Sequence, residues 1–273
     1  MPRFNTSDGL SLHYDDDGAG LPVLCLSGLT RDGRDFDYVA PHLTDVRLIR
    51  MDYRGRGRSD FGDWRDYTLQ REGTDALELL DHLGIEKAAI LGTSRGGLIA
   101  MGLAATVPQR LLGVALNDIG PELDPKGLTN IMGYLGRAPV WKTYEEAAKH
   151  RPHVMPGFAN VPPERWRAEV EKFYVETPTG LTITYDPHLR DAVEQAGATA
   201  VPDLWPFFDA LKPLPTAALR GANSDLLSAD TFAKMQDRHP AMHAATVADR
   251  GHVPFLDEPE SLETLHAWIG AMR

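Results

Sequence analysis

The chain has 273 residues, enough for one large domain, or for a core with one insertion, that buries an apolar interior without disulfides. Its formal net charge of −11 argues against sequence-independent binding of nucleic acid and against docking on anionic membranes, since both need clustered Lys and Arg. No segment approaches the length of a membrane span, and the first residues do not resemble a signal peptide. We expect a cytoplasmic protein with a small-molecule substrate, and a homodimer remains open.

In chain order, the predicted elements alternate between strands and helices. A hairpin over residues 4–14, turning near Asp8-Gly9, comes first. Apolar runs typical of parallel strands buried on both faces lie at residues 23–26, 46–51, 88–91, 112–116, 216–219 and 244–247. Between them, one-sided apolar spacing indicates helices, as in Leu262, Leu265, Ile269 and Met272. This alternation predicts βαβ crossovers and an α/β fold.

Residues 121–205 break the alternation. They contain no convincing parallel strand but many prolines and aromatic residues, which indicates a mostly helical insertion over the sheet. We therefore predict a core of residues 1–120 and 206–273 with a helical lid at 121–205. A TIM barrel is the main alternative, but it requires eight comparable βα units without such an interruption.

The pentapeptide Gly92-Thr93-Ser94-Arg95-Gly96 joins a predicted strand to an apolar helix over residues 97–105. A strand-to-helix turn tight enough to expose a serine hydroxyl strains the backbone and leaves no room for flanking side chains, hence the two glycines. The pattern alone is weak, but in this context it predicts Ser94 as a nucleophile.

A serine hydroxyl needs an adjacent base at neutral pH, and histidine is the suitable side chain. Of ten histidines, His252 follows the last predicted strand, where a loop at the carboxyl edge of the sheet can reach Ser94. Asp225 follows the strand at 216–219 and is the favoured residue to orient His252, in the order that a nucleophile-elbow fold uses. Asp118, just past the strand at 112–116, is the alternative acid.

Acyl transfer places negative charge on a carbonyl oxygen, which two backbone N–H groups can stabilise. We expect these donors at Arg95, directly after the nucleophile, and at Leu29, in the loop after the strand at 23–26. The glycine- and arginine-rich run over residues 52–60 lacks the ending of a P-loop and the spacing of a dinucleotide site. We interpret it as a structural loop with solvated arginines.

Metal and redox sites are not indicated. The pair His150 and His153 has no Cys or closely spaced carboxylate beside it, so both are expected on the surface. The single cysteine, Cys25, lies in an apolar run and is expected to be a buried thiol. We expect neither a metal nor an organic cofactor.

Together these motifs resemble the α/β-hydrolase superfamily, over essentially the whole chain outside the insertion. The matching segments are residues 26–29, 52–59, 92–97, 220–225 and 251–252. The resemblance implies a mostly parallel eight-stranded sheet flanked by helices, a lid over the active site, and similarity to small bacterial carboxylesterases and enol-lactone hydrolases. Ser27 departs from the pattern, because many members have histidine before the oxyanion glycine.

The expected activity is hydrolysis of esters or lactones through an acyl-Ser94 intermediate. Dehalogenases and epoxide hydrolases of this superfamily have a similar pattern, but with aspartate at the position of the nucleophile. Ser94 therefore argues against both activities. Carbon–carbon bond hydrolysis of vinylogous diketones, perhydrolysis and prolyl aminopeptidase activity use the same triad and stay open. A low-turnover ligand-binding receptor is the alternative from another class.

Overall fold

The computed structural model describes residues 1–155, 157–198 and 202–273. Its strands form an eight-stranded sheet in the order β1-β2-β4-β3-β5-β6-β9-β10, in which β1, β2 and β4 pair antiparallel and all later neighbours pair parallel. The strands are β1 (Arg3–Asn5), β2 (Ser11–Gly18), β3 (Leu21–Leu26), β4 (Val46–Met51), β5 (Ala88–Thr93), β6 (Leu111–Asn117), β9 (Thr216–Gly221) and β10 (His243–Val247). The predicted opening hairpin and the predicted parallel strands are confirmed.

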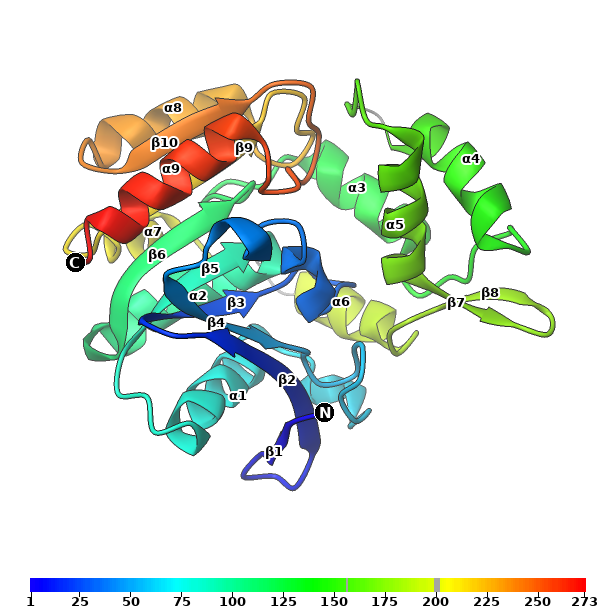
Figure 1. Cartoon of the computed structure of the whole chain (residues 1–273), viewed down its shortest axis with the longest axis horizontal. Coiled ribbons are helices and arrows are strands. Elements are labelled where there is room, and N and C mark those ends of the chain that lie inside the picture. Colours follow the sequence, from blue (N-terminus) through cyan, green and yellow to red (C-terminus); the bar gives the residue numbers. More distant parts are fainter. Residues whose placement is uncertain (156, 199–201) are drawn as a thin grey trace.

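The central strands are buried on both faces because helices cover both (Figure 1). Alternate residues point to opposite sides, so that Leu24 and Ile90 join one core cluster while Val23 and Leu91 join the other. The first cluster includes side chains of helices α1 (Leu69–His82), α2 (Arg95–Thr106), α7 (Trp205–Asp209) and α8 (Ala229–Arg238). The second cluster includes α9 (Pro259–Gly270) and the short turns at residues 33–42. Cys25 is fully buried in that second cluster, as predicted.

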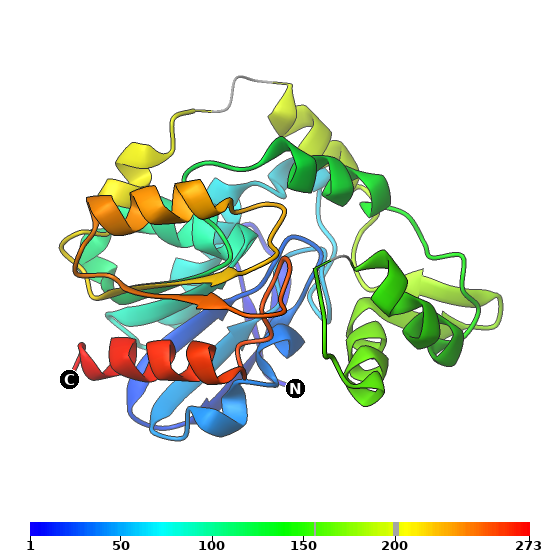
Figure 2. The same ribbon diagram turned by 90° about the horizontal axis from the view of Figure 1, so that it is seen from above.

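The predicted insertion lies between β6 and β9, beside the core (Figure 2). It contains α3 (Pro125–Tyr134), α4 (Tyr144–Val154), α5 (Pro163–Phe173), α6 (Leu189–Gly197) and an antiparallel hairpin of β7 (Tyr174–Thr177) and β8 (Gly180–Ile183). The hairpin was not expected from the sequence, because each strand has only four residues and the buried side chain of Leu181 stands without an alternating apolar pattern around it. The division of the chain at 120 and 205 stays a prediction.

One end of the insertion is attached to the loop that follows β4. Arg56 and Tyr185 form an isolated antiparallel bridge. On either side of it, the Gly57 N–H donates to the Thr184 carbonyl at 3.0 Å, and the Asp186 N–H donates to the Gly55 carbonyl at 2.8 Å. These backbone contacts connect the insertion to a loop of the core.

In the part of the chain that the structure describes, we find no helix that is both apolar enough and long enough to cross a membrane.

Candidate active site

Ser94 lies on a sharp turn between β5 and α2. Its backbone has φ 49° and ψ −112°, a conformation that residues other than glycine rarely adopt. The Ser94 N–H donates to the Asn117 carbonyl at 3.0 Å. A Cβ on Gly92 would lie 2.6 Å from backbone atoms of Gly96, and a Cβ on Gly96 would lie 2.0 Å from the Leu26 carbonyl oxygen. Both glycines are therefore required for the backbone contacts that hold Ser94 in this turn.

Ser94 lies next to His252, in the loop between β10 and α9. The Ser94 Oγ to His252 Nε2 distance is 3.0 Å, and the other ring nitrogen, Nδ1, lies 2.7 Å from Asp118 Oδ2. An ionised carboxylate can only accept, so this contact places the proton on Nδ1 and leaves Nε2 free to accept the serine hydroxyl. The three side chains form one hydrogen-bonded series with the polarity that activates a serine.

Asp118 is fully buried and is oriented by the loop after β9. The Gly221 N–H donates to Asp118 Oδ1 at 2.7 Å, and the Ser224 hydroxyl donates to Oδ2 at 2.6 Å. Asp118 has φ 55°, which turns its carboxylate away from the line of β6. Three donors thus hold the carboxylate, one of them the His252 ring.

The structure places Asp118, the alternative acid, and not the favoured Asp225, within hydrogen-bond distance of His252 Nδ1. Asp225 lines the cavity onto which Ser94 and His252 open, which is described below, but its Oδ2 accepts from the Asn130 side chain at 2.6 Å. Strands β6 and β9 are neighbours, so both loops reach the same sheet edge, and the chain order serine, aspartate, histidine fits either residue. What distinguishes them is the β9 loop itself, because its donors at Gly221 and Ser224 bind Asp118.

The two expected oxyanion donors flank Ser94. A Cβ on Gly28 would lie 3.9 Å from the Ser94 Cβ, which puts the loop carrying Leu29 against the nucleophile. Among the described residues, neither the Leu29 N–H nor the Arg95 N–H is used in a hydrogen bond. Both donors are therefore free for a ligand.

Buried ion pairs connect the loops that carry these donors. Arg56 donates to the Leu29 carbonyl at 3.1 Å and pairs with Glu72 at 2.8 Å, while Glu72 also pairs with the Arg95 side chain at 2.5 Å. The interpretation of solvated arginines in this loop is wrong for Arg54 and Arg56, which are fully buried. Buried carboxylates, Asp75 for Arg54 and Glu72 for Arg56, pair with them and make burial tolerable.

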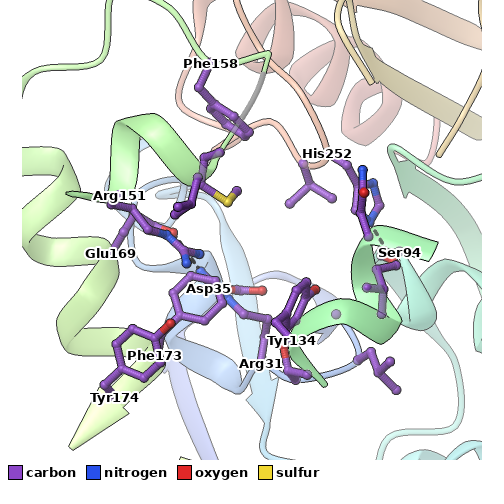
Figure 3. A pocket seen from close by; sticks show the side chains of 18 of the residues that line it. Arg31, Asp35, Ser94, Tyr134, Arg151, Phe158, Glu169, Phe173, Tyr174 and His252 are labelled. Carbon is purple, nitrogen blue, oxygen red and sulfur yellow. Dashed lines mark hydrogen bonds and ion pairs between the residues drawn. The ribbon is translucent and has the colours of Figure 1, made fainter. Parts of the chain in front are cut away.

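Ser94 and His252 open on a cavity of about 630 Å³ between the core and the insertion (Figure 3). Six of the aromatic residues noted in the insertion line it, namely Trp141, Phe158, Trp166, Phe173, Tyr174 and Tyr185. Its size and its largely apolar lining, with a few polar groups, suit a small organic ligand.

The wall opposite the nucleophile contains buried charges. Arg31 pairs with Asp35 and, at 3.0 Å, with Glu169, and it stacks over the Phe173 ring at 3.7 Å. Burial raises the pKa of Asp35 to about 6, in spite of the charge of Arg31. Burial also opposes ionisation of Glu169, but the nearby charges of Arg31 and Lys172 outweigh it and lower the pKa of that carboxyl. Arg151 adds another cation to this wall.

Within the described ranges, no group of three or more His, Cys, Asp or Glu side chains is placed to hold a metal ion. His150 and His153 are exposed on α4, as predicted, and the His150 ring stacks on Trp141.

Comparison with known proteins agrees with this geometry. Residues 23–264 match the model of the alpha/beta hydrolase family. The chain belongs to the α/β hydrolase family. Among curated proteins it is 37% identical over 251 residues to a 3-hydroxybutyrate-oligomer hydrolase of Cupriavidus necator, covering 88% of this chain and 85% of the relative. It is also 25% identical to a pimeloyl-[acyl-carrier protein] methyl ester esterase of Aeromonas salmonicida, covering 96% of this chain and all of that protein.

A solved structure supports the same assignment. An alpha/beta hydrolase from Novosphingobium aromaticivorans superposes with a TM-score of 0.91 and 38% identity, covering 98% of this chain and 97% of that one. The predicted α/β-hydrolase fold is confirmed. The family and these relatives identify an ester-cleaving hydrolase, which was also the predicted class of enzyme.

Within this α/β hydrolase, sequence reasoning missed several residues around the site. Ser224 directly precedes Asp225 and no motif marks it, and Arg56 lies in the loop predicted to carry solvated arginines. Glu72 lies on the buried side of α1, where two carboxylates, Glu72 and Asp75, interrupt an apolar pattern, and this interruption was the available signal. Nothing in the sequence singles out Arg151 among the basic residues of the insertion.

Proposed function

We propose that the protein hydrolyses carboxylic esters, including lactones, through an acyl intermediate on Ser94. The observation that carries the proposal is the hydrogen-bonded series of Ser94, His252 and Asp118 opening on the cavity. Two free N–H groups beside Ser94, at Leu29 and Arg95, provide the oxyanion site.

In the acylation step, His252 Nε2 takes the hydroxyl proton as Ser94 Oγ attacks the ester carbonyl carbon. The oxygen that becomes negative accepts from the N–H groups of Leu29 and Arg95. The ester C–O bond then breaks, and His252 returns the proton to the leaving alkoxide. In deacylation, His252 removes a proton from water, which attacks the acyl carbon; the bond between that carbon and Ser94 Oγ then breaks, the acid is released, and His252 returns the proton to Ser94 Oγ. Asp118 holds the required ring orientation throughout.

For the substrate, we propose linear oligoesters of short hydroxyacids. The support is the 37% identity, over most of both chains, to a protein named for hydrolysis of 3-hydroxybutyrate oligomers. A cavity of about 630 Å³ lies in the size range of drug-sized ligands, large enough for such a short oligoester.

Burst kinetics with p-nitrophenyl butyrate test the mechanism. The native protein should release p-nitrophenol in a burst equal to the active-site concentration, followed by a slower steady state. Ser94→Ala should abolish the burst and lower the rate by about 10⁴-fold or more. A folded native protein that binds the ester without turnover would instead favour a ligand-binding receptor.

A further inference from the structure

Arg151 is a buried cation on the wall of the cavity that has no acceptor or counter-ion among the described residues. The described chain buries four arginines, Arg54, Arg56, Arg151 and Arg220. Three of them donate to carboxylates or backbone carbonyls. Arg151, only 8% exposed, has no hydrogen bond or ion pair with any described residue, and its Nε is a buried donor without an acceptor. Burying a guanidinium without acceptors lowers the stability of the folded protein, so a ligand that supplies the acceptors is the explanation to test.

The protein contacts the flat face of the Arg151 guanidinium but offers no hydrogen-bond acceptor to the N–H groups along its edge. The guanidinium lies over the Phe173 ring, 4.1 Å from the centroid, a contact that uses one face of the group. The N–H donors of a guanidinium lie along its edge and need acceptors in the same plane. Figure 3 shows Arg151 directed into the cavity, across from Ser94 and His252. The free donors thus face the space that a substrate would occupy.

The nearby carboxylates are already engaged by another arginine. Glu169 lies close enough to Arg151 to raise the pKa of its guanidinium, but no ion pair joins the two residues. Both Glu169 and Asp35 form ion pairs with Arg31 instead. Lys172, which acts on Glu169, pairs through its ammonium with Asp37 at 3.6 Å. Burial lowers the pKa of Arg151, as expected for a cation whose charge is not fully balanced. A further anion beside Arg151 would supply that balance.

We propose that Arg151 binds the free terminal carboxylate of an ester substrate whose scissile carbonyl lies at Ser94. This inference rests on the proposed ester hydrolysis. A planar guanidinium offers two parallel N–H donors that match the two oxygens of a carboxylate. In a linear hydroxyacid oligoester the free carboxylate belongs to the alcohol side of the last ester bond. Arg151 therefore holds the hydroxyacid that leaves when Ser94 is acylated, and it favours cleavage of the terminal ester bond.

Binding to a protein that cannot turn over separates this inference from the mechanism. In the Ser94→Ala background, calorimetry with the linear dimer of 3-hydroxybutyrate is compared with its primary amide, which is neutral at the same position. The acid should bind more tightly than the amide, and adding Arg151→Gln should weaken binding of the acid by about 10- to 100-fold while removing the preference. Arg151→Lys keeps the positive charge but loses the two parallel N–H donors, so it should retain part of the preference for the acid over the amide.

Two control variants make the result specific. Arg167 is an exposed arginine on the next helix, so Arg167→Gln should bind acid and amide as the parent does. Arg137 lines the cavity but is exposed, and a loss of acid preference in Arg137→Gln with none in Arg151→Gln would overturn the assignment. Equal binding of acid and amide by the parent would overturn it too. A circular dichroism melt of each variant confirms that it is folded.

Steady-state kinetics give the second readout. For the native protein, the ratio of kcat/KM for the acid dimer to that for the amide dimer should exceed about tenfold and fall towards one in Arg151→Gln, mainly through KM. A native protein that binds the acid through Arg151 but cleaves no ester would leave the carboxylate site standing and contradict the proposed hydrolysis instead.

Discussion

The two walls of the cavity treat buried charge differently. On the core wall, every buried arginine and carboxylate around Ser94 has a partner of opposite charge or a hydrogen bond, as in the group of Arg56, Glu72 and Arg95. On the insertion wall, Arg151 has neither an ion pair nor a hydrogen bond with any described residue, and the carboxylate nearest to it, Glu169, pairs with Arg31 at 3.0 Å instead. Matched groups fix the geometry of the catalytic loops before a ligand arrives, whereas unmatched groups leave interactions for the ligand to complete.

The largest expected effect comes from replacing Asp118, the carboxylate that contacts His252 on the core wall. Asp118→Asn should lower kcat for p-nitrophenyl butyrate by about 10⁴-fold, because an amide in place of the carboxylate favours the wrong histidine tautomer. Asp225→Asn is the matched control, since it makes the same change at the other candidate aspartate, which lines the cavity, and it should lower kcat by less than about tenfold. The reverse order of the two variants would show that the loop rearranges and that Asp225 is the acid in solution.

The next effect concerns stability rather than turnover. Glu72→Gln leaves the buried guanidinium of Arg56 and the partly buried one of Arg95 without their carboxylate, and should lower the free energy of unfolding by about 3–5 kcal/mol. Urea denaturation measures it. Glu78→Gln, on the same helix but partly exposed, should cost no more than about 1 kcal/mol. Similar losses for both would mean that the core wall is not held by this ion-pair group.

A third prediction concerns Asp35, a buried acid in the turn at residues 33–36 that lines the cavity. The pKa of Asp35 is raised to about 6, so the folded protein binds a proton more tightly than the unfolded chain, and the resulting stability is present at about pH 4 and lost as the pH rises through 6. Asp35→Asn removes this dependence. The stability of the native protein relative to the variant should therefore fall by up to about 3 kcal/mol between pH 4 and pH 7.5. A difference that is flat across this range would contradict the raised pKa.

The smallest expected effect is the stability of Arg151→Gln. Because no described ion pair or hydrogen bond is broken, the lost stacking on Phe173 and the relieved burial of charge should nearly cancel, leaving a change of less than about 1 kcal/mol. Urea denaturation in the absence of ligand measures it beside Glu72→Gln. A loss as large as that of Glu72→Gln would place Arg151 among the structural arginines and erase the contrast between the two walls.

Periodicity and glycine placement were sufficient to predict the fold and the positions of Ser94 and His252, since alternating buried strands and a tight turn leave direct traces in the sequence. The choice between Asp118 and Asp225 depended on a backbone turn at Asp118 and on donors from a neighbouring loop, which are properties of the folded chain. Arg151 was unrecognisable for the same reason, because the lack of a partner exists only in three dimensions.

The bridge between Arg56 and Tyr185 makes the insertion part of the catalytic scaffold as well as a cover. The Arg56 side chain donates to the Leu29 carbonyl, and the backbones of its neighbours Gly55 and Gly57 are hydrogen-bonded to the insertion, so a displacement at Tyr185 is expected to reach a loop beside Ser94. Grafting a foreign insertion onto this core would therefore succeed only with residues 184–186 kept as a fixed joint.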